Sequence, residues 1–172
     1  MGRKGRGGGG VSRAGLGLAG LVLALALAAP APPQTGLPQL LAARHPNGLG
    51  VSYPADLAAR EVPDGFAFAS RAALRRPVAF TMHLVEGPPP AGPWTGTRRL
   101  GPALVALYRI ERDPARAVDV GSGGEEHRLV AVRELPGGRH LRLEQVAQAE
   151  APDAPDFGAG WLVLRHATAP ER

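Results

Sequence analysis

Alternating apolar and polar residues, separated by glycine and proline, predict a series of short strands from about residue 45 onward. The clearest run is "PVAFTMHLVEG", in which Val78, Phe80, Met82 and Leu84 share one face of an extended chain. The segments "GLGVSYP", "DGFAFAS" and "ALVALYRIER" have the same period of two and end at turn-forming residues. Each of these four segments is therefore predicted to be a strand.

The second half of the chain predicts a hairpin. The segments "EEHRLVAVREL" and "RHLRLEQVAQAE" flank "PGG" at 136–138, and such a short glycine turn between two apolar runs is typical of a β-hairpin. Between the earlier strands, "GPPPAGPWTG" at 87–96 is too rich in proline and glycine for regular structure and predicts a surface loop.

One helix is expected near the C-terminus. In "PDFGAGWLVLRHA", Phe157, Trp161 and Leu164 are spaced i, i+4, i+7, and Asp156 suits the start of a helix. The fold class predicted from these patterns is α+β, with an antiparallel β-sheet of about six or seven strands and helix cover.

The N-terminal segment has the parts of a secretory signal peptide. Four basic residues precede an apolar run from 14 to 29: Arg3, Lys4, Arg6 and Arg13. Ala26 and Ala28 form an A-x-A cleavage site. We therefore expect a signal peptide at 1–28, a Pro-rich lead at 29–44 and a single α+β domain at 45–169. An uncleaved anchor is the alternative, but the run is shorter than the ~20 residues that span a bilayer, so we expect no stable membrane insertion after cleavage.

Charge and cysteine content narrow the function classes. The chain has 20 basic and 15 acidic residues, and 1–28 hold four basic and no acidic ones, which leaves 16 against 15. A nearly neutral domain with only isolated pairs, Arg75-Arg76 and Arg98-Arg99, does not favour nucleic-acid binding. The chain has no cysteine, which excludes disulfides, thiol catalysis and thiolate metal sites.

The glycine cluster "GSGGEEHRLVAV" at 121–132 fails the motifs that it suggests. The only lysine is Lys4, so no Walker loop is present, and Glu126 stands where a dinucleotide fingerprint needs glycine. Val120 likewise replaces the first glycine of a hydrolase elbow around Ser122. The glycine cluster is therefore expected to be a flexible turn before a strand. The five histidines form neither HxH nor HExxH, so we also expect no metal site and no cofactor.

Acidic residues and one tryptophan are the candidate binding groups. Glu125 and Glu126 are neighbours, so on a strand they point to opposite faces and do not form a catalytic carboxylate pair. The segment 144–157 has four acidic residues and no basic one: Glu144, Glu150, Asp153 and Asp156. It is either a solvated loop or an acidic patch for a cationic partner. Trp94 is either an interface anchor or packed on the core.

Four segments resemble a known family. "HPNGLGVSYPADLAAREVPDGFAF", "GPWTGTRRLGPALVALYRIE", "GSGGEEHRLVAV" and "PDFGAGWLVLRHA" are similar to the periplasmic immunity proteins of bacterial type VI secretion that neutralise a muramidase effector. The opening "GLGVSYPADL" with "GFAF" also resembles the PsbP/Mog1-like α/β sandwich. The resemblance implies an exported, non-catalytic inhibitor that plugs the substrate groove of a toxin. Family members are often lipid-anchored, and this chain has no cysteine to acylate.

The resemblance also implies a calcium-linked effector, near whose cation acidic groups of the inhibitor could lie. The expected function is thus a periplasmic immunity protein that binds and inhibits a peptidoglycan-degrading toxin. A periplasmic ligand-binding or accessory domain without catalysis is the alternative, and an enzyme is the third. We predict no catalytic residue. The predicted partner-binding residues are Glu125, Glu126, Glu144, Glu150, Asp153, Asp156 and Trp94.

Overall fold

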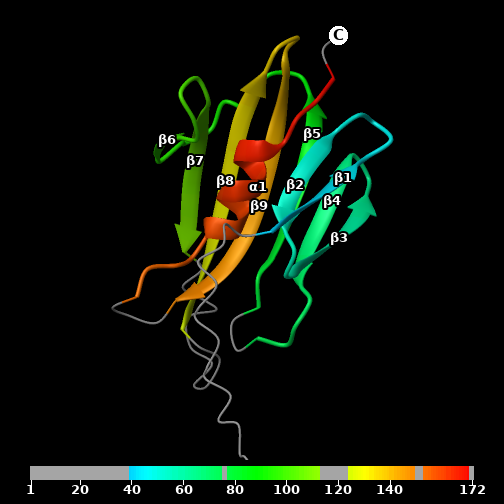
Figure 1. The fold of residues 1–172 in the computed structure, drawn as a ribbon. Coiled ribbons are helices and arrows are strands. Elements are labelled where there is room, and N and C mark those ends of the chain that lie inside the picture. The colour runs from blue at the N-terminus through cyan, green and yellow to red at the C-terminus, as the bar shows by residue number, and fades with distance from the viewer. Residues whose placement is uncertain (1–38, 75–76, 113–123, 150–152, 171–172) are drawn as a thin grey trace, which may run out of the picture. The chain divides into compact units, whose positions relative to one another are not determined.

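The computed structural model describes residues 39–74, 77–112, 124–149 and 153–170 (Figure 1). These residues form a small sheet, a large sheet and one helix. The elements in chain order are β1 (Leu40–Arg44), β2 (Gly50–Pro54), β3 (Leu57–Val62), β4 (Gly65–Ser70), β5 (Ala79–Glu86), β6 (Gly96–Arg99), β7 (Val105–Arg112), β8 (Glu125–Leu135), β9 (Arg139–Ala149) and α1 (Gly158–His166).

The large sheet is antiparallel and has the order β3-β4-β5-β9-β8-β7-β6. Its centre is the β8–β9 hairpin, in which Leu135 pairs with Arg139. The turn needs Gly137 and Gly138, whose φ angles of 79° and 70° lie in the region that side chains disfavour. Gly65 is required for a different reason, close packing, because a Cβ there would lie 1.9 Å from the backbone oxygen of Met82.

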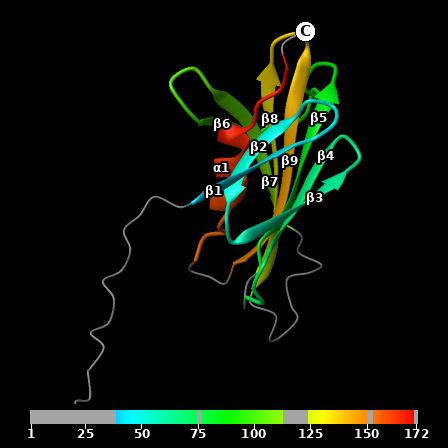
Figure 2. The same cartoon turned by 45° about the vertical axis from the view of Figure 1, so that its right-hand side comes forward.

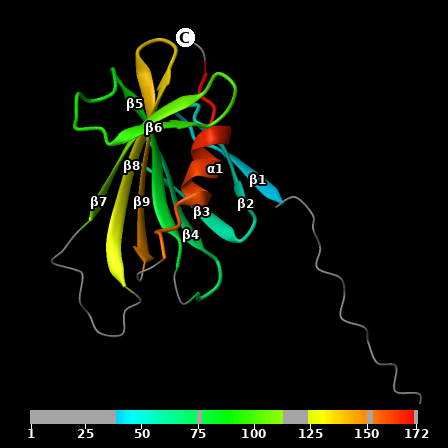
Figure 3. The same cartoon turned by 90° about the vertical axis from the view of Figure 1, so that its left-hand side faces the viewer.

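One face of the large sheet, which we call the inner face, is covered by α1 and by the β1–β2 hairpin (Figures 1 and 3). The ring of Trp161 on α1 meets Tyr108 of β7 edge to face at 5.7 Å, and the ring of Tyr53 on β2 meets Phe68 of β4 at 5.4 Å. The alternation in β4 and β5 places their aromatic and aliphatic side chains in this layer, where Met82 is fully buried. The hydrophobic core therefore lies between the sheet and its cover.

The C-terminal segment joins the small sheet to α1. Thr168 and Gly50 exchange two backbone hydrogen bonds of 2.8 Å each, so the chain after α1 runs antiparallel to β2. Helix α1 also contacts β2 directly (Figure 2). Two buried arginines hold this segment: Arg133 donates to the backbone oxygens of Arg165 and Ala167, and Arg139 donates to that of Pro170.

The strand and helix patterns are confirmed, and the predicted class needs a correction. The six predicted strands are β2, β4, β5, β7, β8 and β9, and the predicted helix is α1. The part of the chain that the structure describes is mainly β, with a single short helix, so "α+β with helix cover" overstates the helix. Strands β1, β3 and β6 were not predicted, and β1 lies inside the segment predicted as a Pro-rich lead. The PsbP/Mog1-like likeness remains a prediction.

The only described helix, α1, has nine residues. Among the described residues, none of the helical structure is long and apolar enough to cross a membrane. The predicted signal peptide at 1–28 and most of the lead lie outside the described residues.

Candidate functional site

The face of the large sheet opposite α1 carries most of the charged side chains of the central strands. We call it the outer face. Strand alternation and register assign side chains from four strands to it. Its central residues are Leu107, Arg109 and Glu111 of β7, Arg128, Val130 and Val132 of β8, Arg142, Glu144 and Val146 of β9, and Thr81 and His83 of β5. Among the described elements, α1 and the β1–β2 hairpin both pack on the inner face, so neither covers this one.

Glu144 is the centre of an ion-pair cluster on the outer face. Its Oε1 lies 2.6 Å from Nη2 of Arg142, and its Oε2 accepts a hydrogen bond from Nη2 of Arg128. Arg142 is two residues away on the same strand, and Arg128 lies diagonally across on β8, so both guanidinium groups reach the carboxylate. We refer to Arg128, Glu144 and Arg142 as the arginine cluster.

The electrostatics of the arginine cluster favour the charged forms of its groups. Burial by itself would raise the pKa of Glu144, but the hydrogen bond from Arg128 and the charges of Arg142 and Arg128 outweigh it and lower that pKa. The same hydrogen bond and charge raise the pKa of Arg128. Glu144 is therefore an anion engaged at both oxygens.

Trp94 and Arg109 border the outer face at the 87–95 loop. The Arg109 guanidinium lies 5.7 Å from the centre of the Trp94 ring, and its Nε lies 2.7 Å from Oε1 of Glu111. Trp94 is half-buried, and the loop is tied to the sheet by the hydrogen bond from the amide of Thr95 to the carbonyl of Tyr108. The Trp94 ring thus lies beside an outer-face arginine and is partly open to solvent. Its role as an interface anchor remains a prediction.

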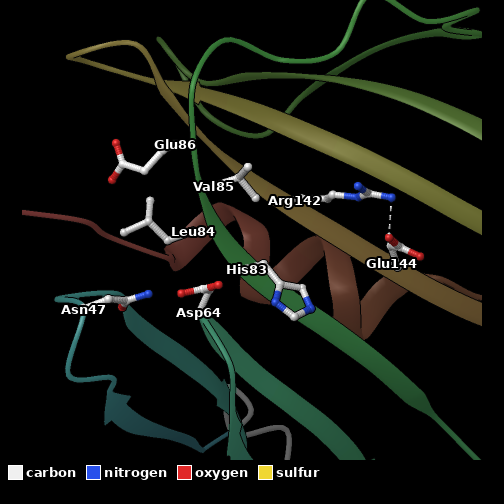
Figure 4. A pocket seen from close by; sticks show the side chains of 8 residues that line it. All are labelled: Asn47, Asp64, His83, Leu84, Val85, Glu86, Arg142 and Glu144. Atoms are coloured by element: carbon white, nitrogen blue, oxygen red, sulfur yellow. Dashed lines mark ion pairs between the residues drawn. The ribbon is translucent and has the colours of Figure 1, made fainter.

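A cavity of about 720 Å³ opens beside the arginine cluster. Figure 4 shows Arg142 and Glu144 on one side of it, Asn47 and Asp64 on the other, and His83 between them. Asp64 lies in the turn between β3 and β4 with φ 61°, and His83 Nδ1 lies 3.2 Å from the carbonyl oxygen of Pro63 in the same turn. Leu84, Val85 and Glu86 complete the lining.

Glu125 and Glu126 are the first residues of β8, so their side chains leave opposite faces of the sheet, as the sequence predicted. Glu125 pairs with Arg112 of β7 and has His127 Nε2 at 4.0 Å. Glu126 falls on the outer face, two residues before Arg128. The rest of the glycine stretch, 121–123, lies outside the described residues.

The remaining predicted acids are Glu150, Asp153 and Asp156. Asp156 accepts a 2.7 Å hydrogen bond from the amide of Gly158 and so supports the start of α1. Asp153 is exposed in the segment before α1, and Glu150 lies outside the described residues. Of the predicted acids that the structure describes, Glu126 and Glu144 share the outer face, whereas Asp156 lies at the start of α1. Their predicted contact with a partner remains a prediction.

Sequence reasoning missed the arginines. Arg128 and Arg142 are spread over two strands, and only the register of β8 and β9 shows that they meet at Glu144. The single available signal was the position of Arg142 two residues before the acidic segment, on the same face of a strand. His83 lies on the face of β5 opposite Phe80 and Met82.

The described residues hold no group of three or more His, Cys, Asp or Glu side chains that could bind a metal ion. The outer face is formed by ion pairs and by apolar side chains that range from buried Val130 to exposed Val146.

This combination defines a mainly antiparallel β domain with a charged sheet face that no described helix or small sheet covers. The family model of the type six secretion immunity 3 domain (Tsi3) matches residues 50–168. The match includes β2 through α1 and covers more than half of the chain, so the chain belongs to this family of type VI secretion immunity domains. An immunity domain binds and neutralises a protein effector, and family membership favours a non-catalytic inhibitor over an enzyme.

Solved structures support the fold alone. Five chains match, among them one from a crystal structure of a Bacteroides thetaiotaomicron VPI-5482 protein at 1.50 Å resolution, with a TM-score of 0.52 and 11% sequence identity. The alignment covers 72% of this chain and 45% of that one, so this chain spans less than half the length of that neighbour. No curated protein matches the sequence.

Proposed function

We propose that this chain acts in the periplasm, where it inhibits a peptidoglycan-degrading effector by covering the effector's substrate groove. The observation that carries the proposal is the match of residues 50–168 to a type VI secretion immunity domain. The sequence resemblance to immunity proteins that neutralise a muramidase adds the target class. The basic flank, the short apolar run and the A-x-A site before residue 29 support export.

The geometry is consistent with inhibition by covering a groove. The outer face offers a wide charged surface on rigid strands, and binding sites on strands hold their side chains more firmly than sites on loops. Half-buried Trp94 at its border supplies an aromatic side chain of the kind that dominates interface energies. The chain would then act by shape and charge, without a reaction of its own.

The alternative, a ligand-binding or accessory domain, would favour an apolar cleft. The cavity beside the arginine cluster is instead lined mainly by polar and charged side chains, Asp64, Glu86, Glu144 and Arg142 among them, along with two aliphatic residues. Such a lining suits contact with a charged protein surface better than the enclosure of an apolar ligand.

A protection assay tests the proposal. The effector is sought as a lytic protein encoded beside this chain. That protein is directed to the periplasm of a bacterial host, with either the full chain or a chain that lacks residues 1–28. We expect lysis to be prevented only by the full chain, and the purified domain to stop peptidoglycan solubilisation by the same protein. Equal protection by the shortened chain would contradict the periplasmic site, and unhindered solubilisation with bound inhibitor would contradict the covered groove.

A further inference from the structure

In the arginine cluster, the cations are the solvent-exposed members and the anion is the sheltered one. The side chains of Arg128 and Arg142 are 51% and 40% exposed, whereas that of Glu144 is 24% exposed. A partner that approaches this part of the outer face therefore meets guanidinium groups before it meets the carboxylate. The acidic residue that stands out in the sequence is covered by its own arginines.

Glu144 is also saturated. One oxygen is engaged by Arg142 and the other by Arg128, so a cationic group of a partner would have to displace an arginine to reach it. The two contacts instead fix the direction of two long side chains, which removes part of the rotamer entropy that they would lose on binding. Arg128 and Arg142 are thereby pre-organised on neighbouring strands.

We propose that Arg128 and Arg142 bind carboxylate groups on the effector and that Glu144 is the positioning residue that aims them. The inference rests on the proposed function and deepens it by naming the contact surface and the chemistry of the partner. Charge complementarity to the two exposed guanidinium groups indicates that the partner's binding groups are carboxylates. An enzyme that cleaves glycosidic bonds lines its groove with paired carboxylates, and the planar guanidinium group matches a carboxylate with two parallel hydrogen bonds.

The rest of the outer face carries both charges, with Glu111 and Glu126 near Arg128 and a third arginine on β7. Arg109 lies one strand further along, opposite Val130, and is oriented by Glu111 and Trp94. Val130 and Val132 lie between the arginines and are buried, so the charged side chains extend from a well-packed part of the sheet. Arginine and tryptophan are among the residue types that carry most of the energy of protein interfaces.

The test is a kinetic binding experiment with the purified protein encoded beside this chain. It compares the wild-type domain with Arg128→Gln, Arg142→Gln and Glu144→Gln. We expect each arginine variant to weaken binding about ten-fold or more, chiefly through slower association that depends on salt. Glu144→Gln removes a negative charge, so association should not slow, but dissociation should accelerate because the arginines lose their orientation.

Two further variants serve as controls. Arg128→Lys keeps the charge without the planar fork, and we expect it to retain the association rate but to dissociate faster. Arg44→Gln removes an exposed arginine of β1, on the small sheet that packs against the inner face, and should bind as wild type does. Thermal unfolding of every variant checks that the fold is kept, which we expect because Arg128 is largely exposed.

The inference is overturned if both arginine variants bind as wild type does. It is also overturned if Glu144→Gln causes the largest loss while the arginine variants bind more tightly, because a carboxylate would then be the contact group. If the wild-type domain itself fails to bind, the proposed function fails and this inference fails with it.

Discussion

The two faces of the central strands are formed by alternate residues of the same segments and differ in what they contact. Along β9, Leu141 and Leu143 point to the inner face and are fully buried, while Arg142 and Glu144 between them point to the outer face and stay partly exposed. The inner face is held by packing against α1 and β2. On the outer face, the charged side chains of neighbouring strands form ion pairs with one another. This difference teaches that in this domain one set of alternate positions encodes the fold, while the other set is free to carry the interaction surface that we propose.

The largest difference in stability between the two faces is expected at the aromatic layer of the inner face. Phe68 is 2% exposed and stacks on Phe80 with ring centres 4.6 Å apart. Phe68→Ala should lower the free energy of unfolding by about 3–5 kcal/mol, because it leaves a cavity that the sheet cannot close. Urea unfolding measures the change. Val146→Ala on the outer face, where the side chain is 40% exposed, is the matched control and should change stability by less than about 0.5 kcal/mol.

A second test uses two arginines of β8 that lie on opposite faces. Arg133 is 4% exposed and its Nη1 donates to the carbonyl oxygen of Arg165 at 3.1 Å, at the end of α1. Burial lowers the pKa of Arg133, but the group is held by the backbone oxygens at the helix end. Arg133→Met should cost about 1–3 kcal/mol because those oxygens lose their donor.

Arg128→Met is the counterpart on the outer face. It should cost less than about 1 kcal/mol, since an exposed ion pair contributes little to stability. Thermal unfolding of both variants gives the comparison. Equal losses would show that the outer face also holds the fold, and the division of roles would be wrong.

The smallest expected effect is the pH dependence of the arginine cluster. The pKa of Glu144 is lower in the folded chain than in the unfolded one, so its contribution is fully present above the unfolded value, about 4.3. The contribution is lost as the pH falls through the folded pKa. Wild type should therefore exceed Glu144→Gln by up to about 1 kcal/mol at pH 7, and the difference should shrink below about pH 4. A difference that grew in acid would contradict the assigned ion pairs.

The inner face could be predicted from the sequence because alternation leaves a direct signal. Phe80, Met82 and Leu84 predicted β5, and the "PGG" turn predicted the β8–β9 hairpin. Strands β3 and β6 were missed because they are the two edges of the large sheet. Edge strands need little burial on either face, and the residues of β6, "GTRR", show no apolar alternation.

The outer face could not be predicted, because its pairs depend on register. Arg128 and Glu144 are 16 residues apart, and their contact exists only because β8 and β9 pair with Val130 opposite Glu144. A count of charges along the chain identified an acidic segment and missed the arginines that neutralise its first member. Asp156 had two predicted roles, at a helix start and in an acidic patch, and its hydrogen bond from the amide of Gly158 agrees with the first.

The most direct test of the central claim is arginine footprinting of the unmodified domain. The domain is treated with an arginine-selective dicarbonyl reagent, alone and with a saturating amount of the purified protein encoded beside it, and mass spectrometry follows each modified site. The account predicts that Arg128 and Arg142 react in the free domain and are protected in the complex, while Arg44 on β1 reacts equally in both. Protection of Arg44 with continued reaction of Arg128 and Arg142 would place the effector away from the outer face and contradict the account.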